Sequence, residues 1–184
     1  MSGSTPFFFD MKTNVDDNTC CLHDIIQLGW NVRDEYRNYY IKGCTYIDQK
    51  SHHTLDHLKK HGYLFNDAIQ VFLEDIKKVH NPMLVAHNAN FNCDCLVHNM
   101  KLHSCSSIDI DFVSNLQRFC TMAGGTQLLH GQINKSSSLL EFREALGLDN
   151  TTTQTFDALN NVIMLKEAYI VAFMDGGGHT VTIF

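Results

Sequence analysis

The stretch Met83-Leu84-Val85-Ala86-His87-Asn88-Ala89-Asn90-Phe91-Asn92 does most to decide the fold of this chain. Its first four residues are apolar and follow Pro82, which is typical of a short buried strand with a proline at its start. A helix is predicted over Asn90–Met100, after the polar residues His87 and Asn88. The stretch therefore predicts a buried strand that leads through a short polar segment into a helix.

Upstream of this stretch, three further strands are predicted over Pro6–Lys12, Asp24–Val32 and Tyr36–Lys42. Apolar residues recur at helical spacing within Tyr63–Val79 and are flanked by charged residues, which predicts a helix with one face on the sheet. The first half of the chain therefore predicts a sheet and one covering helix.

Downstream, a short fifth strand is predicted over Ile108–Ile110 and a helix over Phe112–Phe119. A long helix over Thr155–Phe173 follows later in the chain, and Gly176-Gly177-Gly178 is expected to end it. These elements predict an α/β fold with a five-stranded mixed sheet flanked by helices.

The last residues, 179–184, alternate polar and apolar side chains as a strand does. We therefore divide the chain into a domain over residues 1–175 and a tail over residues 176–184. The tail can return to an edge of its own sheet or pair with the edge of another subunit. Val181, Ile183 and Phe184 are its candidate assembly residues.

Three segments, in this order, resemble the motifs of the DEDDh (DnaQ-like, ribonuclease H fold) family of 3′→5′ exonucleases. Phe7–Lys12 resembles the apolar strand that ends in Asp-x-Glu, and His87–Asn92 resembles His-Asn-Ala-x-Phe-Asp. Phe156–Asn161 is similar to His-x-Ala-x-x-Asp on a late helix, and Ser136–Leu146 resembles the short helix that precedes this motif in the family. The resemblance implies a ribonuclease-H-like exonuclease fold over most of the chain.

The chain departs from the family at most positions that the resemblance assigns to chemistry. Asp10 is retained, whereas Lys12, Asn92 and Asn161 stand where the family has carboxylates, and Phe156 stands where it has the general-base histidine. Family enzymes hold two divalent ions about 3.5–4 Å apart, and magnesium prefers anionic oxygen ligands. Here the charges of one Asp and one Lys cancel, and a phenyl ring cannot accept the proton of an attacking water. The degenerate site predicts a loss of catalysis.

The retained Asp10 and three of the four departures also have ordinary structural interpretations. Asp10 can be a strand-end residue, Lys12 a solvated charge, Asn92 a helix N-cap and Asn161 an unremarkable helix residue. Together they favour the degenerate site, because four departures fall on the positions that the chemistry needs. If Lys12 balances the charge once supplied by metal, it should lie close to Asp10.

A rearranged active site is the weaker alternative. Asp157 lies one helical turn before Asn161, and Asp109 and Asp111 fall at the end of the predicted fifth strand. A site built from Asp10, Asp157 and Asp111 is conceivable. Asp94 is expected to point away from the Asn92 direction, because it lies two residues farther along a helix.

Length and composition favour one compact domain without a membrane partner. The chain has 184 residues, 44% of them hydrophobic, and neither a signal-peptide pattern nor a membrane-length apolar stretch, so an intracellular location, cytoplasmic or nuclear, is expected. Its 14 basic and 20 acidic residues give a net charge of −6, which disfavours a nucleic-acid surface built on phosphate contacts.

Cysteine and histidine are abundant, but their spacing predicts no metal site or cofactor. The seven cysteines cannot all pair internally, and Cys20 and Cys21 are the candidates for an intermolecular disulfide. Two clusters lack the paired Cys-x₂-Cys spacing of zinc sites. They are His53, His57 and His61, and Cys93, Cys95, His98, His103 and Cys105.

Two functional classes remain. The favoured one is a noncatalytic module that self-assembles as a homo-oligomer or binds a protein partner. The alternative is a nucleic-acid-binding pseudonuclease, with Lys12, His87 and Asn88 as the candidate binding residues.

Overall fold

The computed structural model describes residues 3–13, 24–42, 60–129, 137–150 and 157–174, and the structural statements below concern these residues. Five strands form one sheet in the order β3-β2-β1-β4-β5. They are β1 (Thr5–Thr13), β2 (Ile25–Val32), β3 (Glu35–Tyr40), β4 (Pro82–Ala86) and β5 (Gln117–Cys120). The β1–β2 and β2–β3 pairs are antiparallel, and the β1–β4 and β4–β5 pairs are parallel. The prediction of a mixed five-stranded sheet is confirmed.

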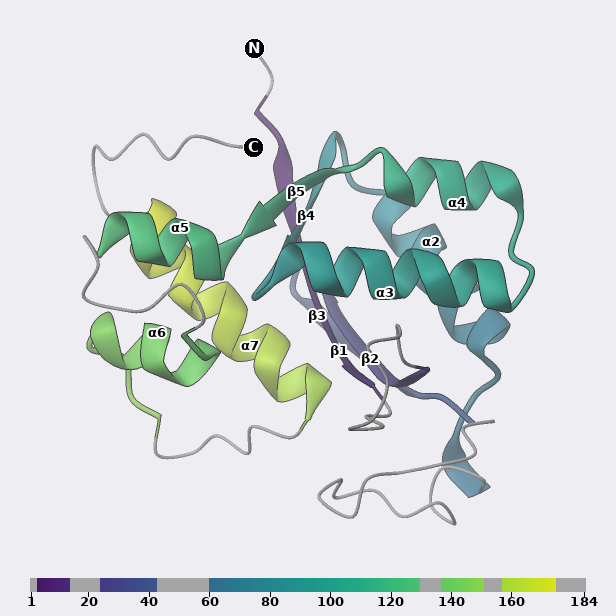
Figure 1. Cartoon of the computed structure of the whole chain (residues 1–184), viewed down its shortest axis with the longest axis horizontal. Helices are drawn as coiled ribbons and strands as arrows, with labels where there is room; N and C mark the ends of the chain where they lie inside the picture. Colours follow the sequence, from purple (N-terminus) through teal and green to yellow (C-terminus); the bar gives the residue numbers. More distant parts are fainter. Residues whose placement is uncertain (1–2, 14–23, 43–59, 130–136, 151–156, 175–184) are drawn as a thin grey trace.

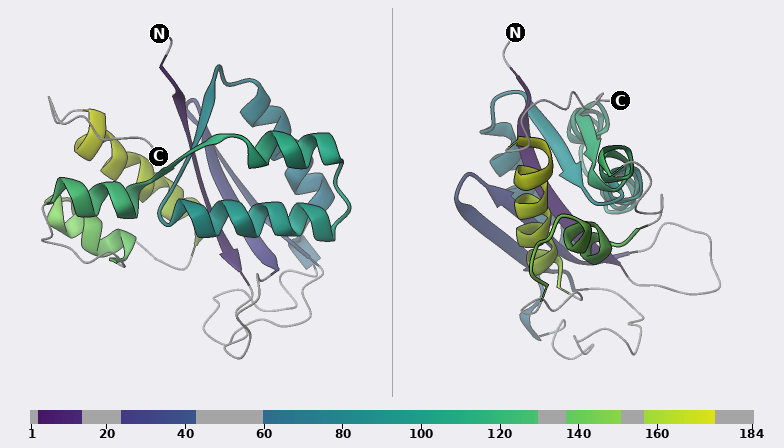
Figure 2. Two further views of the ribbon diagram at one scale, coloured as in Figure 1. Left: turned by 45° about the horizontal axis from the view of Figure 1, so that its top comes forward. Right: turned by 90° about the vertical axis from the view of Figure 1, so that its left-hand side faces the viewer.

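Helices lie on both sides of this sheet, as Figures 1 and 2 show. One side carries α2 (Phe65–Lys77), α3 (Ala89–Leu102) and α4 (Ser107–Ser114). The other carries α5 (Thr121–Leu128), α6 (Leu139–Ala145) and α7 (Ala158–Tyr169), which continues into the π-helical segment η1 (Ile170–Met174). The sheet therefore separates two layers of helix.

The alternation of side chains along β1 divides the core into two halves. Phe7 and Phe9 are fully buried toward α2, where Phe7 packs edge-on against Phe72. Phe8 points to the opposite face and packs against Tyr169 of α7. Consecutive residues of a strand point to opposite faces, so three successive phenylalanines anchor both helical layers.

Most predicted elements are confirmed within a few residues of their expected bounds. The prediction for the segment after α3 was wrong. Residues 108–110 are helical, because Ser106 caps α4 by accepting a hydrogen bond from the Asp109 backbone N–H. The fifth strand is β5, nine residues later than predicted, where a helix was expected. Gln117 and Arg118 are polar, but β5 is an edge strand of the described sheet and tolerates exposed polar side chains.

Helix α5 was not predicted, because it contains Gly124 and Gly125, which are poor helix formers. Aromatic rings occupy the space beside both glycines: Phe119 and Phe173 beside Gly124, and Phe142 beside Gly125. A side chain at either position would collide with these rings, so tertiary packing explains the glycines.

Several predicted features lie outside the described residues. These are the tail over residues 176–184 with Val181, Ile183 and Phe184, the pair Cys20 and Cys21, the histidines His53 and His57, and Phe156. Within the described part of the chain, no helix combines the length and the apolar character needed to cross a membrane.

Candidate functional site

The candidate site lies on the face of the sheet that α7 covers. Asp10 and Lys12 share this face with Phe8, because alternate residues of β1 point the same way. The antiparallel register places Gly29 of β2 opposite Asp10, and Gln27 opposite Lys12. The sheet thus brings a carboxylate, an ammonium group, an amide and a glycine together beneath α7.

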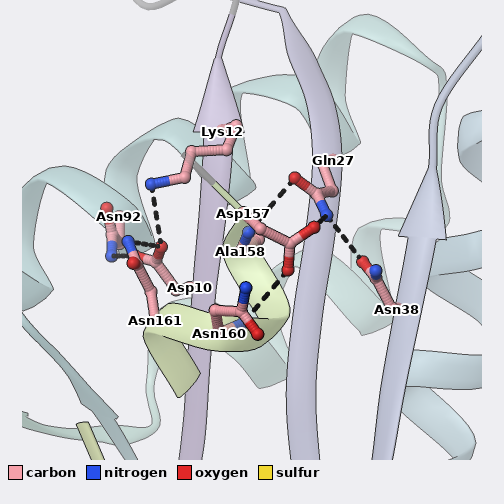
Figure 3. A network of polar contacts seen from close by, with 9 residues as sticks. All are labelled: Asp10, Lys12, Gln27, Asn38, Asn92, Asp157, Ala158, Asn160 and Asn161. Carbon is pink, nitrogen blue, oxygen red and sulfur yellow. Dashed lines mark hydrogen bonds and ion pairs between the residues drawn. The ribbon is translucent and has the colours of Figure 1, made fainter. Parts of the chain in front are cut away.

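Three side chains surround the Asp10 carboxylate (Figure 3). The Asn92 side-chain amide donates a hydrogen bond to Oδ1 of Asp10 at 3.2 Å, and the Asn161 amide donates to Oδ2 at 2.8 Å. Nζ of Lys12 lies 3.8 Å from Oδ2. The expected proximity of Lys12 and Asp10 is confirmed. Both carboxylate oxygens of Asp10 accept hydrogen bonds from amide side chains.

Asn92 reaches Asp10 from the first turn of α3. The helix begins after Asn88, whose backbone is left-handed with φ of 70°, and the Asn92 backbone N–H donates to the Asn88 carbonyl. The alternative of Asn92 as an N-cap was wrong, because Asn88 holds that position and makes no side-chain cap. The Asn92 side chain is free to turn toward β1, where it is buried.

Asn161 reaches Asp10 from α7, and a second polar network fixes the start of this helix (Figure 3). The Gln27 amide donates to Asp157 Oδ2 at 2.7 Å and to Asn38 Oδ1 at 2.9 Å, while Gln27 Oε1 accepts from the Ala158 backbone N–H at 3.1 Å. Asp157 Oδ1 caps α7 through the Asn160 backbone N–H. Asp157 is therefore engaged in fixing the helix.

Sequence reasoning missed Gln27 as a member of this site. Its signal was a single polar residue within the apolar run Ile25-Ile26-Gln27-Leu28, and its side chain is fully buried in the structure. A buried amide requires hydrogen-bond partners on both its oxygen and its nitrogen. Those partners come from α7 and β3, which the sequence alone does not place.

Burial raises the pKa of Asp10, and the Lys12 charge and the two amides oppose this rise. Desolvation disfavours the charged carboxylate, whereas nearby donors and a cation favour it. In this site, burial therefore disfavours the charged carboxylate while three neighbouring side chains favour it.

His87, a candidate nucleic-acid-binding residue, is held inside the protein. Its Nε2 lies 2.8 Å from the Ser137 carbonyl and its Nδ1 lies 3.0 Å from the Thr121 hydroxyl. A carbonyl only accepts, so Nε2 carries the proton and Nδ1 accepts from the hydroxyl. Burial lowers the pKa of His87, which favours this neutral ring. The Asn88 side chain, in contrast, is exposed.

A small pocket of about 140 Å³ adjoins the site. It is lined by Asp10, His87, Leu139, Asn161 and Leu165. Its volume is well below the range of about 300–1,000 Å³ that is usual for ligand pockets. The described residues therefore leave little room beside Asp10 for a nucleotide.

The carboxylates considered for a rearranged site are engaged elsewhere. Asp109 pairs with Lys77 at 2.6 Å, and Asp94 pairs with Arg118 at 2.9 Å on the surface. Asp111 is exposed on α4, which packs against α3 (Figure 1), so it does not join Asp10. The strand-end placement of Asp109 and Asp111 was therefore wrong, and the expectation that Asp94 points away is confirmed.

The metal ions that the fold implies do not fit the described residues. No group of three or more His, Cys, Asp or Glu side chains in the described part of the chain is arranged to hold a metal ion. At Asp10, two amides present N–H groups and Lys12 presents an ammonium group. These groups repel a dication, whereas magnesium requires oxygen ligands.

Comparison with solved structures identifies the fold. The nuclease domain of 3′hExo, a DEDDh family member bound to rAMP, superposes with a TM-score of 0.75 at 11% identity, over 96% of this chain and 95% of that domain. Exonuclease X in complex with 5′-overhanging duplex DNA superposes with a TM-score of 0.62 at 17% identity, over 96% of this chain and 95% of that one. Exonuclease I of E. coli with single-stranded DNA gives 0.69 at 16% identity, over 95% of this chain and 41% of that one.

Comparisons at the sequence level find no match. No family model matches the chain, and no curated protein matches it either. At 11% to 17% identity, the structural likeness concerns the fold alone. It confirms the architecture expected from the three motif-like segments: the chain has the ribonuclease-H-like fold of the DEDDh exonuclease domains.

Proposed function

We propose that this chain is an exonuclease-like domain that does not hydrolyse phosphodiesters and serves as a binding or assembly module. The observation that carries the proposal is the environment of Asp10. Its carboxylate accepts hydrogen bonds from Asn92 and Asn161 and lies beside the Lys12 ammonium group. Donors thus occupy the directions from which metal ions would approach in a two-metal enzyme.

The charges of the site support this proposal. Two dications would bring four positive charges against the single carboxylate of Asp10, and Lys12 adds a further positive charge. In a two-metal nuclease the ions generate the hydroxide and stabilise both the attacking and leaving oxygens. Without those ions, the described residues offer no group for either task.

A nuclease assay tests the proposal directly. The purified chain is incubated with 3′-labelled and 5′-labelled single-stranded and duplex DNA and RNA, in the presence of Mg²⁺ or Mn²⁺. We expect no loss of label and no ladder of shortened products. The Asp10→Ala variant is the matched control, because it removes the retained carboxylate and separates activity of this site from a contaminating nuclease.

One outcome would overturn the proposal. Metal-dependent 3′→5′ digestion by the purified chain, abolished in Asp10→Ala, would show that the site is active. Digestion that persists in Asp10→Ala would come from a contaminating nuclease. It would not contradict the proposed inactivity of the Asp10 site.

Nucleic-acid binding without hydrolysis is the second candidate function. Lys12 favours it, because its side chain is 26% exposed and sits beside the position of the lost metals, where an ammonium group can contact a phosphate. Solved relatives in the comparison hold single-stranded or duplex DNA. The small volume beside Asp10 and the net charge of −6 oppose it.

Fluorescence anisotropy with a labelled oligonucleotide separates the two candidates. Binding that weakens with salt and in Lys12→Gln, but not in Lys101→Gln on the exposed face of α3, would favour the nucleic-acid function. We expect no such binding. That result would favour the first candidate, a module for self-association or protein binding.

A further inference from the structure

A second and larger pocket lies toward the amino end of β1, whereas Asp10 and Lys12 lie toward its carboxyl end. Its volume is about 460 Å³, within the range of about 300–1,000 Å³ that ligand pockets occupy. Residues from four parts of the chain line it. They are Thr5–Phe8 of β1, Asn31–Arg33 at the end of β2, Lys78–His80 after α2, and Lys166, Ile170 and Met174 of α7 and η1.

The pocket is basic, although the chain as a whole is acidic. Arg33, Lys78, His80 and Lys166 line it, and none of the described residues that line it is acidic. These four side chains come from three segments that are distant in sequence. The fold therefore gathers cations around one cavity of a chain with a net charge of −6.

The cations differ in how far they are already engaged. Lys78 pairs with Asp75 at 3.1 Å, and Lys166 donates to the Arg33 carbonyl at 3.2 Å and lies 5.5 Å from the centre of the Tyr36 ring. The side chains of Arg33 and His80 are exposed. They have donors available for an anion, and the Lys166 ammonium group has donors beyond the one that contacts the Arg33 carbonyl.

Apolar side chains form the remaining wall. Phe8 is buried on the α7 face of the sheet, Ile170 of η1 also lines the cavity, and Met174 at its margin is 63% exposed. An apolar wall with a few polar groups at one side is the usual composition of a small-molecule site. A purely inorganic anion would leave this wall uncovered.

We propose that this pocket binds a small organic anion, whose phosphate or carboxylate group contacts Arg33 and Lys166 and whose apolar body covers Phe8, Ile170 and Met174. Arginine and lysine both pair with phosphate and carboxylate oxygens, arginine through its planar fork of donors. This site is separate from Asp10 and does not depend on the proposed loss of catalysis.

Binding of the fluorescent anion 8-anilinonaphthalene-1-sulfonate to the full chain tests the proposal. N-phenyl-1-naphthylamine, which has similar rings and no charge, is the matched probe. We expect the sulfonate to bind with one-to-one stoichiometry and about tenfold more tightly than the neutral probe, the difference that one hydrogen bond to a charged group supplies. Equal affinity for both probes overturns the proposal.

Two variants locate the binding. Arg33 has a left-handed backbone with φ of 55°, a conformation that asparagine tolerates, so Arg33→Asn removes the guanidinium group and keeps the turn. Arg33→Asn and Lys166→Gln are each expected to weaken sulfonate binding about tenfold. Lys101→Gln removes the same charge from an exposed position on α3 and is expected to leave affinity unchanged. Equal loss in all three variants would reflect net charge alone and would overturn the proposal.

Competition experiments distinguish a phosphate ligand from a carboxylate ligand. Displacement of the sulfonate by a nucleoside 5′-monophosphate identifies a phosphate ligand, and displacement by octanoate identifies a carboxylate ligand. Either result is expected to disappear in the Arg33→Asn/Lys166→Gln double variant. Failure of both competitors to displace the probe overturns the proposal.

Discussion

At the scale of single residues, the site is organised around the one retained carboxylate. A carboxylate buried without partners would be costly, whereas Asp10 accepts two amide hydrogen bonds and lies near an ammonium group. Lys12, Asn92 and Asn161 therefore share one physical role: each directs a positive or partially positive group toward Asp10. Under the proposed loss of catalysis, these groups balance the carboxylate in place of metal ions.

Reversing the charge at residue 12 should destabilise the fold. In Lys12→Glu a second carboxylate faces buried Asp10, and we expect a loss of about 1–3 kcal/mol in the free energy of unfolding, measured by urea denaturation without metal. Lys12→Gln is the control, since it removes the cation without adding an anion, and should lose less. An unchanged midpoint in Lys12→Glu would contradict the pairing of residues 10 and 12.

The pH dependence of stability should reveal the buried state of Asp10. Because burial raises its folded-state pKa above the ordinary 3.8, the stability that this carboxyl contributes is fully present below about pH 3.8 and is lost as the pH rises through the folded-state pKa. The unfolding free energy of the native chain, minus that of Asp10→Asn, should therefore decrease as the pH rises from about 3.8 through the folded-state pKa.

Asp109 provides a control of opposite sign. Its hydrogen bonds from Lys77 and Ser106 lower its pKa, so its contribution to stability is present above 3.8 and is lost as the pH falls through the folded-state pKa. The corresponding difference for Asp109→Asn should increase with pH over the acidic range. The unfolding free energy of the native chain minus that of Asp10→Asn could also increase with pH. In that case the Lys12 charge and the amides would outweigh burial in their effect on the pKa of Asp10.

At the scale of helices and strands, the sequence predicted elements with strong periodicity and missed those set by packing. The run Phe7-Phe8-Phe9 and the apolar spacing of α2 define their elements locally. Strand β5 is only four residues long and half polar, and α5 contains two glycines, so neither has a clear periodic pattern. Their identities depend on β4 and on the rings of Phe119, Phe142 and Phe173.

The same division applies to the site. Asp10, Lys12, Asn92 and Asn161 could be grouped from motif-like segments, and the structure brings all four together. The position of α7 over β2 could not be predicted, because it depends on Gln27 and Gly29, which lie outside the motif-like segments, and on Asp157, to which the third segment assigns no role. Figure 3 shows how two of these, Gln27 and Asp157, hold the start of the helix.

Gly29 should prove essential for the approach of α7 to the sheet. A Cβ atom at this position would lie 3.0–3.1 Å from backbone atoms of Ala158 and Leu159, closer than side chains normally approach. Gly29→Ala should therefore push α7 outward and cost about 1–3 kcal/mol, the usual range for overpacking. Thermal unfolding measures this cost.

A matched glycine separates this effect from glycine replacement in general. Gly3 has nothing within 4 Å of an added Cβ, so Gly3→Ala should leave the melting temperature unchanged. A crystal structure of Gly29→Ala should also show a longer distance between Asn161 Nδ2 and Asp10 Oδ2. A variant as stable as the native chain, with this hydrogen bond intact, would show that α7 adjusts without cost.

At the scale of the whole molecule, the described sheet has two edges and two separate surface features. Strands β3 and β5 stand at its ends, and Tyr63 already pairs with the chain at the end of β3 through a bridge to Ile41. An edge strand can accept a further strand along the part that remains open. The Asp10 site and the basic pocket lie toward opposite ends of β1, so a ligand at one need not obstruct the other. An assembly through a sheet edge is compatible with both features.

We propose that residues 179–184 contribute to such an assembly. His179-Thr180-Val181-Thr182-Ile183-Phe184 alternates polar and apolar residues, the pattern of a strand with one buried face, and an exposed segment of this kind favours docking on an edge. Deletion of these residues should lower the molar mass measured by light scattering while the circular dichroism spectrum of the remaining chain is retained. Val181→Thr/Ile183→Thr keeps the length and β-propensity of the segment but removes its apolar side, and should have the same effect. An unchanged mass in both variants would assign the segment to the edge of its own sheet, or to no sheet, and would leave association to another surface.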